Sequence, residues 1–160
     1  MRDGDGEVER RLAELGIELP PAHPPHGVIE PVVEHGGLAV LSGALPRDLQ
    51  GDLVHPGVVG EDVTVEEGRE AARWAALNCL ATLRAAYGTL DAIDAVFRLR
   101  GIVTCRADFT GQAEVVDGAT EVLHDVFGDR GRGARSAIGG SAPRGACIEL
   151  ELEVRLRPDR

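Results

Sequence analysis

Residues 131–153 read GRGARSAIGGSAPRGACIELELE, and this stretch decides how the chain is interpreted. From residue 148 to 157, apolar and charged side chains alternate. This period of two predicts a strand with one buried and one charged face. Residues 134–138 predict a shorter strand before it, and the glycines, serine and proline between the two segments favour a turn.

Arg135 and Glu149 are the chemistry-bearing side chains of this stretch. If the two predicted strands pair as a hairpin that turns near Ala142, these side chains lie opposite each other on one sheet surface, about 5 Å apart at Cβ. One interpretation is a cross-strand salt bridge that contributes roughly 0.2–1 kcal/mol. The other is an arginine that binds a substrate carboxylate through two hydrogen bonds, with an acid that positions water. Spacing alone leaves both open.

The remaining elements are predicted from periodicity and end signals. The predicted helices cover residues 7–15, 64–87 and 119–127, and the predicted strands cover 27–33, 38–42 and 93–105. The long helix begins with a capping box at Thr64 and Glu67. After the N-terminal helix, the order strand, strand, helix, strand, helix, strand, strand predicts an α+β fold with helices 64–87 and 119–127 on one face of the sheet. The other face carries the charged residues Arg98, Arg100, Glu149, Glu151 and Glu153, so it faces solvent or lines an assembly.

Length and composition limit the class of protein. With 160 residues, the chain suits one domain over 1–160, in which residues 1–26 form a disordered tail, a short helix and a Pro-rich segment. The net charge of −10 argues against nucleic-acid binding, which depends on neutralising phosphates. The polar start, the lack of long apolar runs and three cysteines without metal-site spacing predict a cytoplasmic protein that does not enter membranes.

A metal site is not expected. His23 and His26 have H-x-x-H spacing, but the prolines around them prevent the helix that would bring both imidazoles to one ion. The chain contains no lysine, which excludes Schiff-base chemistry on a lysine.

Several motifs together resemble the Rid family, also called the YjgF group. They include G-x-G-A-R-S-A-I-G at 131–139, P-R-G-A-C-I-E-L-E at 143–151, Leu-Ser-Gly at 41–43 and L-N-C-L-A at 77–81. GTLDAIDAV at 88–96 and the segment from Asp117 to Gly128 agree in order, so the resemblance covers nearly the whole chain.

The resemblance implies a chorismate mutase-like α+β subunit, in which two helices cover one face of a mixed sheet. Such subunits form homotrimers with pockets at their interfaces and use no cofactor. The family arginine that holds the substrate carboxylate falls on Arg135, and the acid that orients water falls on Glu149. The family pocket also falls on Ser42, Gly43 and Phe109.

Two pocket positions depart from the family pattern. Ile29 belongs to the segment where a tyrosine is common, and Ala137 stands where a cysteine or threonine is common. The first functional hypothesis is hydrolysis of reactive enamines and imines, such as 2-aminoacrylate and 2-iminopropanoate, to 2-keto acids and ammonia. The second is a non-catalytic trimer that binds a small carboxylate metabolite. The third is a ribonuclease or translation inhibitor, which the net charge of −10 disfavours.

Overall fold

The computed structural model of the chain describes residues 6–24, 26–158 and 160. Its helices are α1 (Glu7–Glu14), α2 (Val65–Tyr87) and α3 (Gln112–Phe127). Its strands are β1 (Val32–His35), β2 (Leu38–Leu41), β3 (Ile93–Thr104), β4 (Ala134–Gly140) and β5 (Ile148–Leu156). Three short 3-10 turns are η1 (Leu90–Ala92), η2 (Gly128–Gly131) and η3 (Pro143–Gly145). The predicted disordered tail lies outside the described residues except for Gly6.

The five strands form one mixed sheet in the order β1-β2-β5-β3-β4. Strand β3 pairs parallel with β4 and antiparallel with β5, so it lies between the two strands of the C-terminal stretch. The predicted hairpin between these two strands is therefore wrong. The connection between them crosses the end of β3 instead, where Thr104 Oγ1 donates to the Ala146 carbonyl and accepts from the Ala142 amide, both at 2.8 Å.

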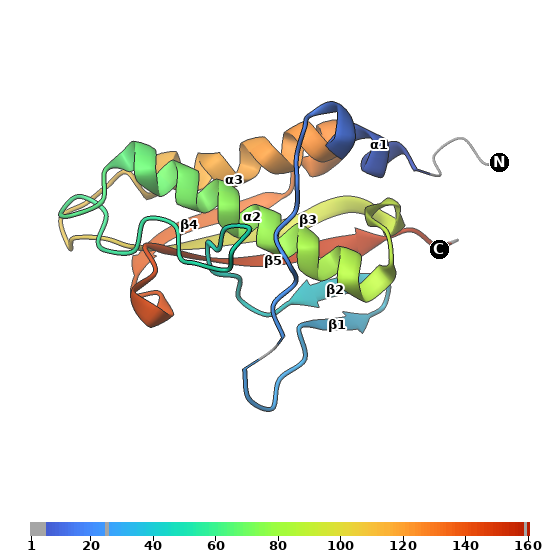
Figure 1. Cartoon of the computed structure of the whole chain (residues 1–160), viewed down its shortest axis with the longest axis horizontal. Coiled ribbons are helices and arrows are strands. Elements are labelled where there is room, and N and C mark those ends of the chain that lie inside the picture. Colours follow the sequence, from blue (N-terminus) through green and yellow to red (C-terminus); the bar gives the residue numbers. More distant parts are fainter. Residues whose placement is uncertain (1–5, 25, 159) are drawn as a thin grey trace.

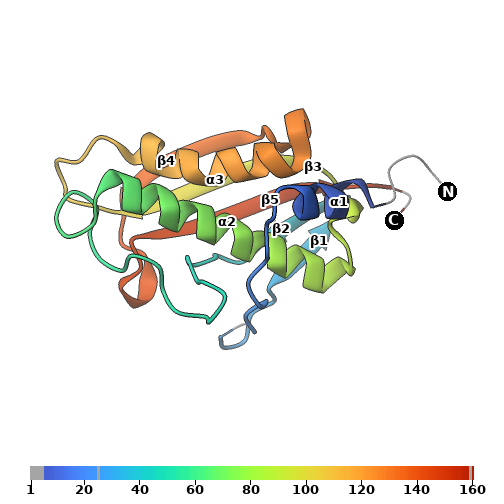
Figure 2. The ribbon, with the colours of Figure 1, turned by 45° about the horizontal axis from the view of Figure 1, so that its top comes forward.

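Helices α2 and α3 lie side by side across one face of the sheet (Figure 1), and the rotated view shows the same arrangement (Figure 2). The predicted α+β fold, with a mixed sheet and two long helices on one face, is confirmed. The capping box is present, because the Glu67 amide donates to Thr64 Oγ1 while Glu67 Oε2 accepts from the Thr64 amide. Helix α3 begins at Gln112, seven residues before the predicted start.

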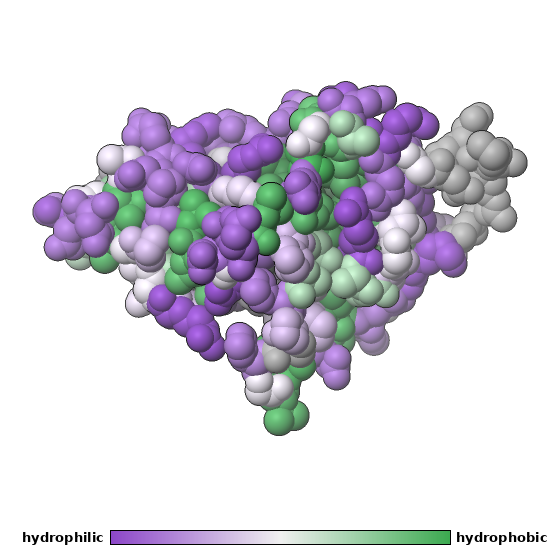
Figure 3. Space-filling view, viewed as in Figure 1, coloured by the Kyte–Doolittle hydropathy of each residue, from purple (hydrophilic) through white to green (hydrophobic). Residues whose placement is uncertain are grey.

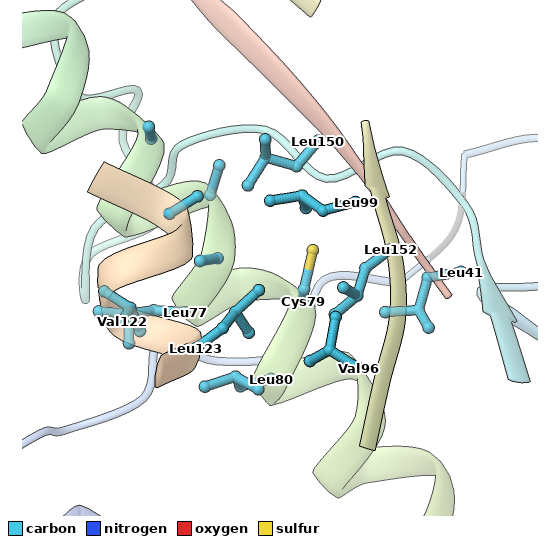
Figure 4. Packing of buried hydrophobic residues seen from close by; sticks show 14 of the residues in the cluster. Leu41, Leu77, Cys79, Leu80, Val96, Leu99, Val122, Leu123, Leu150 and Leu152 are labelled. Atoms are coloured by element: carbon cyan, nitrogen blue, oxygen red, sulfur yellow. The ribbon is translucent and has the colours of Figure 1, made fainter. Parts of the chain in front are cut away.

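The core is aliphatic and lies between these helices and the sheet. Figure 4 shows leucines of α2 and α3 pointing toward those of β3 and β5, with Cys79 among them. Alanines and Gly118 keep the helices slim, because a Cβ added at Gly118 would overlap the Arg69 carbonyl oxygen of α2. Small residues therefore set how closely α2 and α3 approach.

The N-terminal helix α1 is joined to the rest of the molecule through Asp91 of η1. Burial leaves Asp91 only 9% exposed, and its carboxylate accepts the amides of Val8 at 2.9 Å and Glu9 at 3.4 Å. These amides belong to the first turn, which has no intrahelical acceptors and no side-chain cap of its own. Leu12 and Val8 are buried beneath the helix. Among the described helices, none is long and apolar enough to cross a membrane.

The face of the sheet without helices carries a ladder of charged pairs. Arg98 lies opposite Glu153 and Arg100 lies opposite Glu151, with nitrogen–oxygen distances of 3.9 and 2.9 Å. Exposed apolar side chains flank this ladder, among them Val33, Val40 and Ile138. In contrast, the opposite, helix-bearing side drawn in Figure 3 is mostly hydrophilic, with hydrophobic areas that are small and separated.

Candidate active site

A cavity of about 330 Å³ opens beside the charged face of the sheet. Its walls come from residues 23–24 and 26–31 of the Pro-rich segment, the end of β2 with residues 42–47, the middle of α2, the η3 turn and Glu149 of β5. Four of the predicted site residues meet here: Ile29, Ser42, Gly43 and Glu149. These residues lie far apart in the sequence, so the fold has collected them.

Glu149 differs from the other two glutamates of β5 because no arginine lies opposite it. Its partner on β3 is Ile102, whereas Glu151 and Glu153 have Arg100 and Arg98. Among the described residues, no arginine or histidine nitrogen lies within 4.0 Å of its carboxylate. Burial, and then the charge of Glu151, raise the pKa of Glu149 above its ordinary value. A carboxyl group of this kind can hold a proton nearer neutral pH than a solvated glutamate.

Gly43 provides the space that the Glu149 carboxylate occupies. A Cβ added at Gly43 would overlap Glu149 Oε1 and crowd its Cδ at 2.8 Å. The two segments are held together by backbone hydrogen bonds between Ala44 and Leu150, at 2.8 and 2.9 Å. Next to Gly43, Ser42 Oγ donates to the Glu30 carbonyl at 2.7 Å, which fixes the Ile29 segment against the end of β2. The absence of a side chain at Gly43 therefore lets Glu149 approach the backbone.

Arg135 lies away from this cavity within the chain. It is paired with Leu99 of β3, whose side chain is buried on the helix side, whereas Glu149 is paired with Ile102 on the other side. The predicted meeting of Arg135 and Glu149 on one surface is wrong within a single chain. Arg135 Nη1 instead donates to Asp117 Oδ1 of α3 at 2.5 Å and to Thr120 Oγ1 at 3.3 Å.

Two further predicted pocket residues also lie outside the cavity. Ala137 follows Arg135 on the helix side, opposite Gly101 of β3, and is partly buried against the core. The ring of Phe109 packs close to Gly111 and Gly60, where added Cβ atoms would approach it to 2.8 and 3.3 Å. Both residues have packing roles in the single chain.

Several cavity residues were not predicted as site residues. They are His23, His26, Arg47, Asn78 and Arg144. Asn78 has a backbone-binding role, because its Nδ2 donates to the carbonyls of Arg47 at 2.7 Å and Trp74 at 2.8 Å. The turn signal Pro143–Gly145 just before Glu149 could have indicated Arg144. Nothing in the local sequence around Arg47 indicates a site.

The side chains of the described residues do not group into a metal site. Within residues 6–24, 26–158 and 160, no three His, Cys, Asp or Glu side chains are grouped to hold a metal ion. His23 lies near Gly51, and its pKa is lowered by burial, by Arg47 and by His26. A neutral His23 can exchange hydrogen bonds with a ligand at neutral pH but adds no charge.

Known proteins are similar to this chain over most of its length. The family model described as "YjgF/chorismate mutase-like, putative endoribonuclease" matches residues 9–143. The TCP17 protein of Trypanosoma cruzi is 37% identical over 94% of this chain and 95% of its own. The crystal structure of the Atu1372 protein of Agrobacterium tumefaciens is 36% identical, with a TM-score of 0.88 and coverage of 97% and 96%.

A more distant structure, the Rid-family protein YyfA of Yersinia pestis, shares the fold with a TM-score of 0.61 at 22% identity, covering 88% of this chain and 97% of its own. The match to the family model extends over most of the helices and strands described above. The chain therefore belongs to the YjgF/chorismate mutase-like family, the Rid family that its motifs resemble.

Proposed function

We propose that the chain hydrolyses reactive enamines and imines of amino acids to 2-keto acids and ammonia at the Glu149 cavity. The observation that carries this proposal is the half-buried Glu149 carboxyl group, which has no cationic partner among the described residues and has a raised pKa. A general acid–base is most effective when its pKa lies near the working pH. The cavity volume of about 330 Å³ suits a small organic acid.

The chemistry needs one group that moves protons in both directions. Protonated Glu149 gives its proton to the enamine carbon, which yields the iminium ion. The Glu149 carboxylate then accepts a proton from water as the water oxygen bonds to the iminium carbon, and it returns that proton to the nitrogen of the resulting carbinolamine. As the carbon–nitrogen bond breaks, Glu149 takes the hydroxyl proton, so that enamine plus water gives ketone plus ammonia and Glu149 is again protonated.

Arg135 takes part in this proposal through a neighbouring copy of the chain. Strand β4 is an edge of the sheet, so a second subunit can bring its Arg135 to the cavity of the first in a homotrimer. There the guanidinium exchanges Asp117 for the substrate carboxylate. Exposed apolar residues on the uncovered sheet face, such as Val33 and Val40, favour such an assembly.

A second candidate is non-catalytic binding of a small carboxylate. It is favoured by Ile29, which lines the cavity in the segment where the family commonly has a tyrosine, because an aliphatic side chain can transfer no proton. Binding alone does not require Glu149 to act as an acid or base. The two functions differ in whether Glu149→Gln abolishes product formation while keto-acid binding persists.

The experiment generates 2-aminoacrylate in solution and follows its decay and the ammonia released. We expect wild type to accelerate hydrolysis and Glu149→Gln to lose about 10²–10⁴ of that acceleration. The matched control is Glu151→Gln, which removes a carboxylate on the same strand and face that pairs with Arg100 outside the cavity. The proposed hydrolysis of this substrate is overturned if 2-aminoacrylate decays no faster with wild type than in buffer, or if Glu149→Gln is fully active.

A further inference from the structure

Two arginines that line the Glu149 cavity have no acidic partner. Within residues 6–24, 26–158 and 160, Arg47 and Arg144 have no carboxylate oxygen within 4.0 Å. Of the other described arginines, only Arg73 shares this property, and it lies outside the cavity. The chain has a net charge of −10, so carboxylates outnumber the arginines that could pair with them. Two arginines that line one cavity and still have no carboxylate partner among the described residues therefore point to an anionic ligand.

Arg47 is held in place but retains free donors. Its Nη1 donates to the Gly51 carbonyl at 2.7 Å, and its own carbonyl accepts from Asn78 Nδ2, which is buried on α2. Among the described residues, neither Nε nor Nη2 has a hydrogen-bond acceptor, and neither is a buried orphan. Arg47 therefore presents a fixed, water-accessible edge of its guanidinium, which suits an incoming carboxylate.

Arg144 is placed by a turn that an arginine does not favour. Its φ of 61° and ψ of 19° are left-handed, a conformation that is unfavourable for a residue with a Cβ atom. The residue lines the cavity from η3 and is exposed, with no side-chain hydrogen bond to the described residues. Its guanidinium therefore keeps all of its donors for a ligand in the cavity.

We infer that Arg47 and Arg144 form an anion-binding subsite of the Glu149 cavity, so that the substrate carries a second acid group beyond the carboxylate at its reacting end. The inference rests on the proposed function for the imine or enamine group, and it narrows the substrate class to dicarboxylic imino acids or enamines. Two arginine charges and the single Glu149 charge leave the cavity positive, which suits a dianion. Arg135 of a neighbouring copy remains the anchor of the first carboxylate.

The test measures binding of stable keto-acid products by titration calorimetry. We compare 2-oxobutanoate, with one carboxylate, and 2-oxoglutarate, with two, in wild type, Arg47→Gln, Arg144→Gln and Arg73→Gln. Wild type is expected to bind 2-oxoglutarate about tenfold more tightly than 2-oxobutanoate, because the second carboxylate gains one charge-assisted hydrogen bond. Each cavity variant loses that preference and keeps its affinity for the monocarboxylate, while Arg73→Gln retains the preference.

The subsite is overturned if wild type binds the two acids with equal affinity or binds neither. It is also overturned if Arg73→Gln loses the preference for the dicarboxylate as much as the two cavity variants do. Thermal unfolding verifies the fold of each variant, and Arg47→Lys supplies the charge should Arg47→Gln not fold. The outcomes separate the two proposals. If wild type prefers the dicarboxylate but hydrolyses no imine, the subsite is supported and the deaminase function is refuted. If wild type hydrolyses 2-aminoacrylate but shows no such preference, the deaminase function is supported and the subsite is refuted.

Discussion

At the scale of single residues, Gly43 is required because Glu149 occupies the space of a side chain. We predict that Gly43→Ala lowers the free energy of unfolding by about 1–3 kcal/mol, as overpacking does, and displaces the Glu149 carboxyl group from the cavity. Urea unfolding measures the first effect, and the rate of imine hydrolysis measures the second.

The control for this prediction is the double variant Gly43→Ala/Glu149→Ala. Removing the carboxylate leaves room for the new methyl group, so the double variant should unfold at a higher urea concentration than additivity of the single changes predicts. Strictly additive free energies would show that the two residues do not share this space. The backbone at Gly43 is not left-handed, so conformational strain does not confuse the result.

Glu149 also makes stability depend on pH. Burial and Glu151 raise its pKa in the folded chain, so the folded state binds more protons than the unfolded state between the ordinary and the raised pKa. Stability attributable to this group therefore falls as pH rises through that window. We predict that Glu149→Gln is more stable than wild type at pH 7, because glutamine removes the charge that the half-buried wild-type side chain carries there.

The measurement is the urea midpoint from pH 4 to 8 for Glu149→Gln, wild type and Glu151→Gln. The difference between Glu149→Gln and wild type should shrink toward acidic pH, where wild-type Glu149 is itself protonated. In Glu151→Gln the ion pair with Arg100 is lost, so stability should not increase. A Glu149→Gln variant less stable than wild type at pH 7 contradicts the assigned pKa direction.

Individual site residues were only partly predictable from the sequence. Ser42, Gly43 and Glu149 were placed by local motifs, and the fold brings them together in the cavity. The position of Arg135 was predicted wrongly because it depends on the neighbouring strand: β4 pairs with β3, which is distant in the sequence, and not with β5, which follows it. Arg47 could not be found, since a loop arginine without an acidic partner is recognisable only when its surroundings are known.

At the scale of elements, the contact between α2 and α3 depends on glycine. An alanine in a helix is favoured over glycine by about 1 kcal/mol. At Gly118, however, the added methyl group would strike the Arg69 backbone carbonyl, which cannot rotate away. We predict that Gly118→Ala is destabilising by about 2 kcal/mol despite its better helix propensity, measured by urea unfolding.

Gly68 of the same helix pair is the matched control. Its added Cβ would lie 3.2 Å from Val115 Cγ1, the end of a side chain that can shift by a few tenths of an ångström. Gly68→Ala should therefore change stability by less than about 1 kcal/mol, with the propensity gain offsetting the crowding. Equal effects of the two substitutions would refute the idea that backbone contact at Gly118 sets the helix spacing.

The positions of helices and strands along the chain were more predictable than the order of the strands in the sheet. Period two over 148–157 and the capping box at Thr64 are local signals, and both are confirmed as β5 and the start of α2. Gly36 and Gly37 form the turn between β1 and β2, with left-handed φ of 58° and 79°. The order β5-β3-β4 is a long-range property. Helix α3 connects β3 to β4, and this crossover places β4 parallel to β3. The periodicity of a segment gives no information about which strand will lie beside it.

At the scale of the whole molecule, one sheet face has helices and the other has none. On the uncovered face, Val40 lies opposite Val33 of β1 and Glu153 of β5, and it is 45% exposed. The proposed homotrimer covers such side chains, and burying a valine is favourable by about 1.5–3 kcal/mol. A single charge at this position should therefore act on assembly rather than on the subunit fold.

We predict that Val40→Glu converts a wild-type trimer, built from chains of 16.9 kDa, into monomers in light scattering after size-exclusion chromatography. The new carboxylate faces Glu153, which costs the subunit itself only about 0.2–1 kcal/mol, so its circular dichroism should persist. Leu15→Glu is the control, because Leu15 is 37% exposed at the end of α1 on another part of the surface.

The same variant tests whether the active site needs two copies. If Arg135 reaches the cavity only from a neighbouring subunit, monomeric Val40→Glu loses imine hydrolysis even though Glu149, Ser42 and Gly43 remain in place. Leu15→Glu should remain trimeric and active. A monomeric wild type contradicts the assembly, and a monomeric Val40→Glu with full activity shows that one chain suffices. In that case, Arg47 and Arg144 become the anchors of the reacting carboxylate.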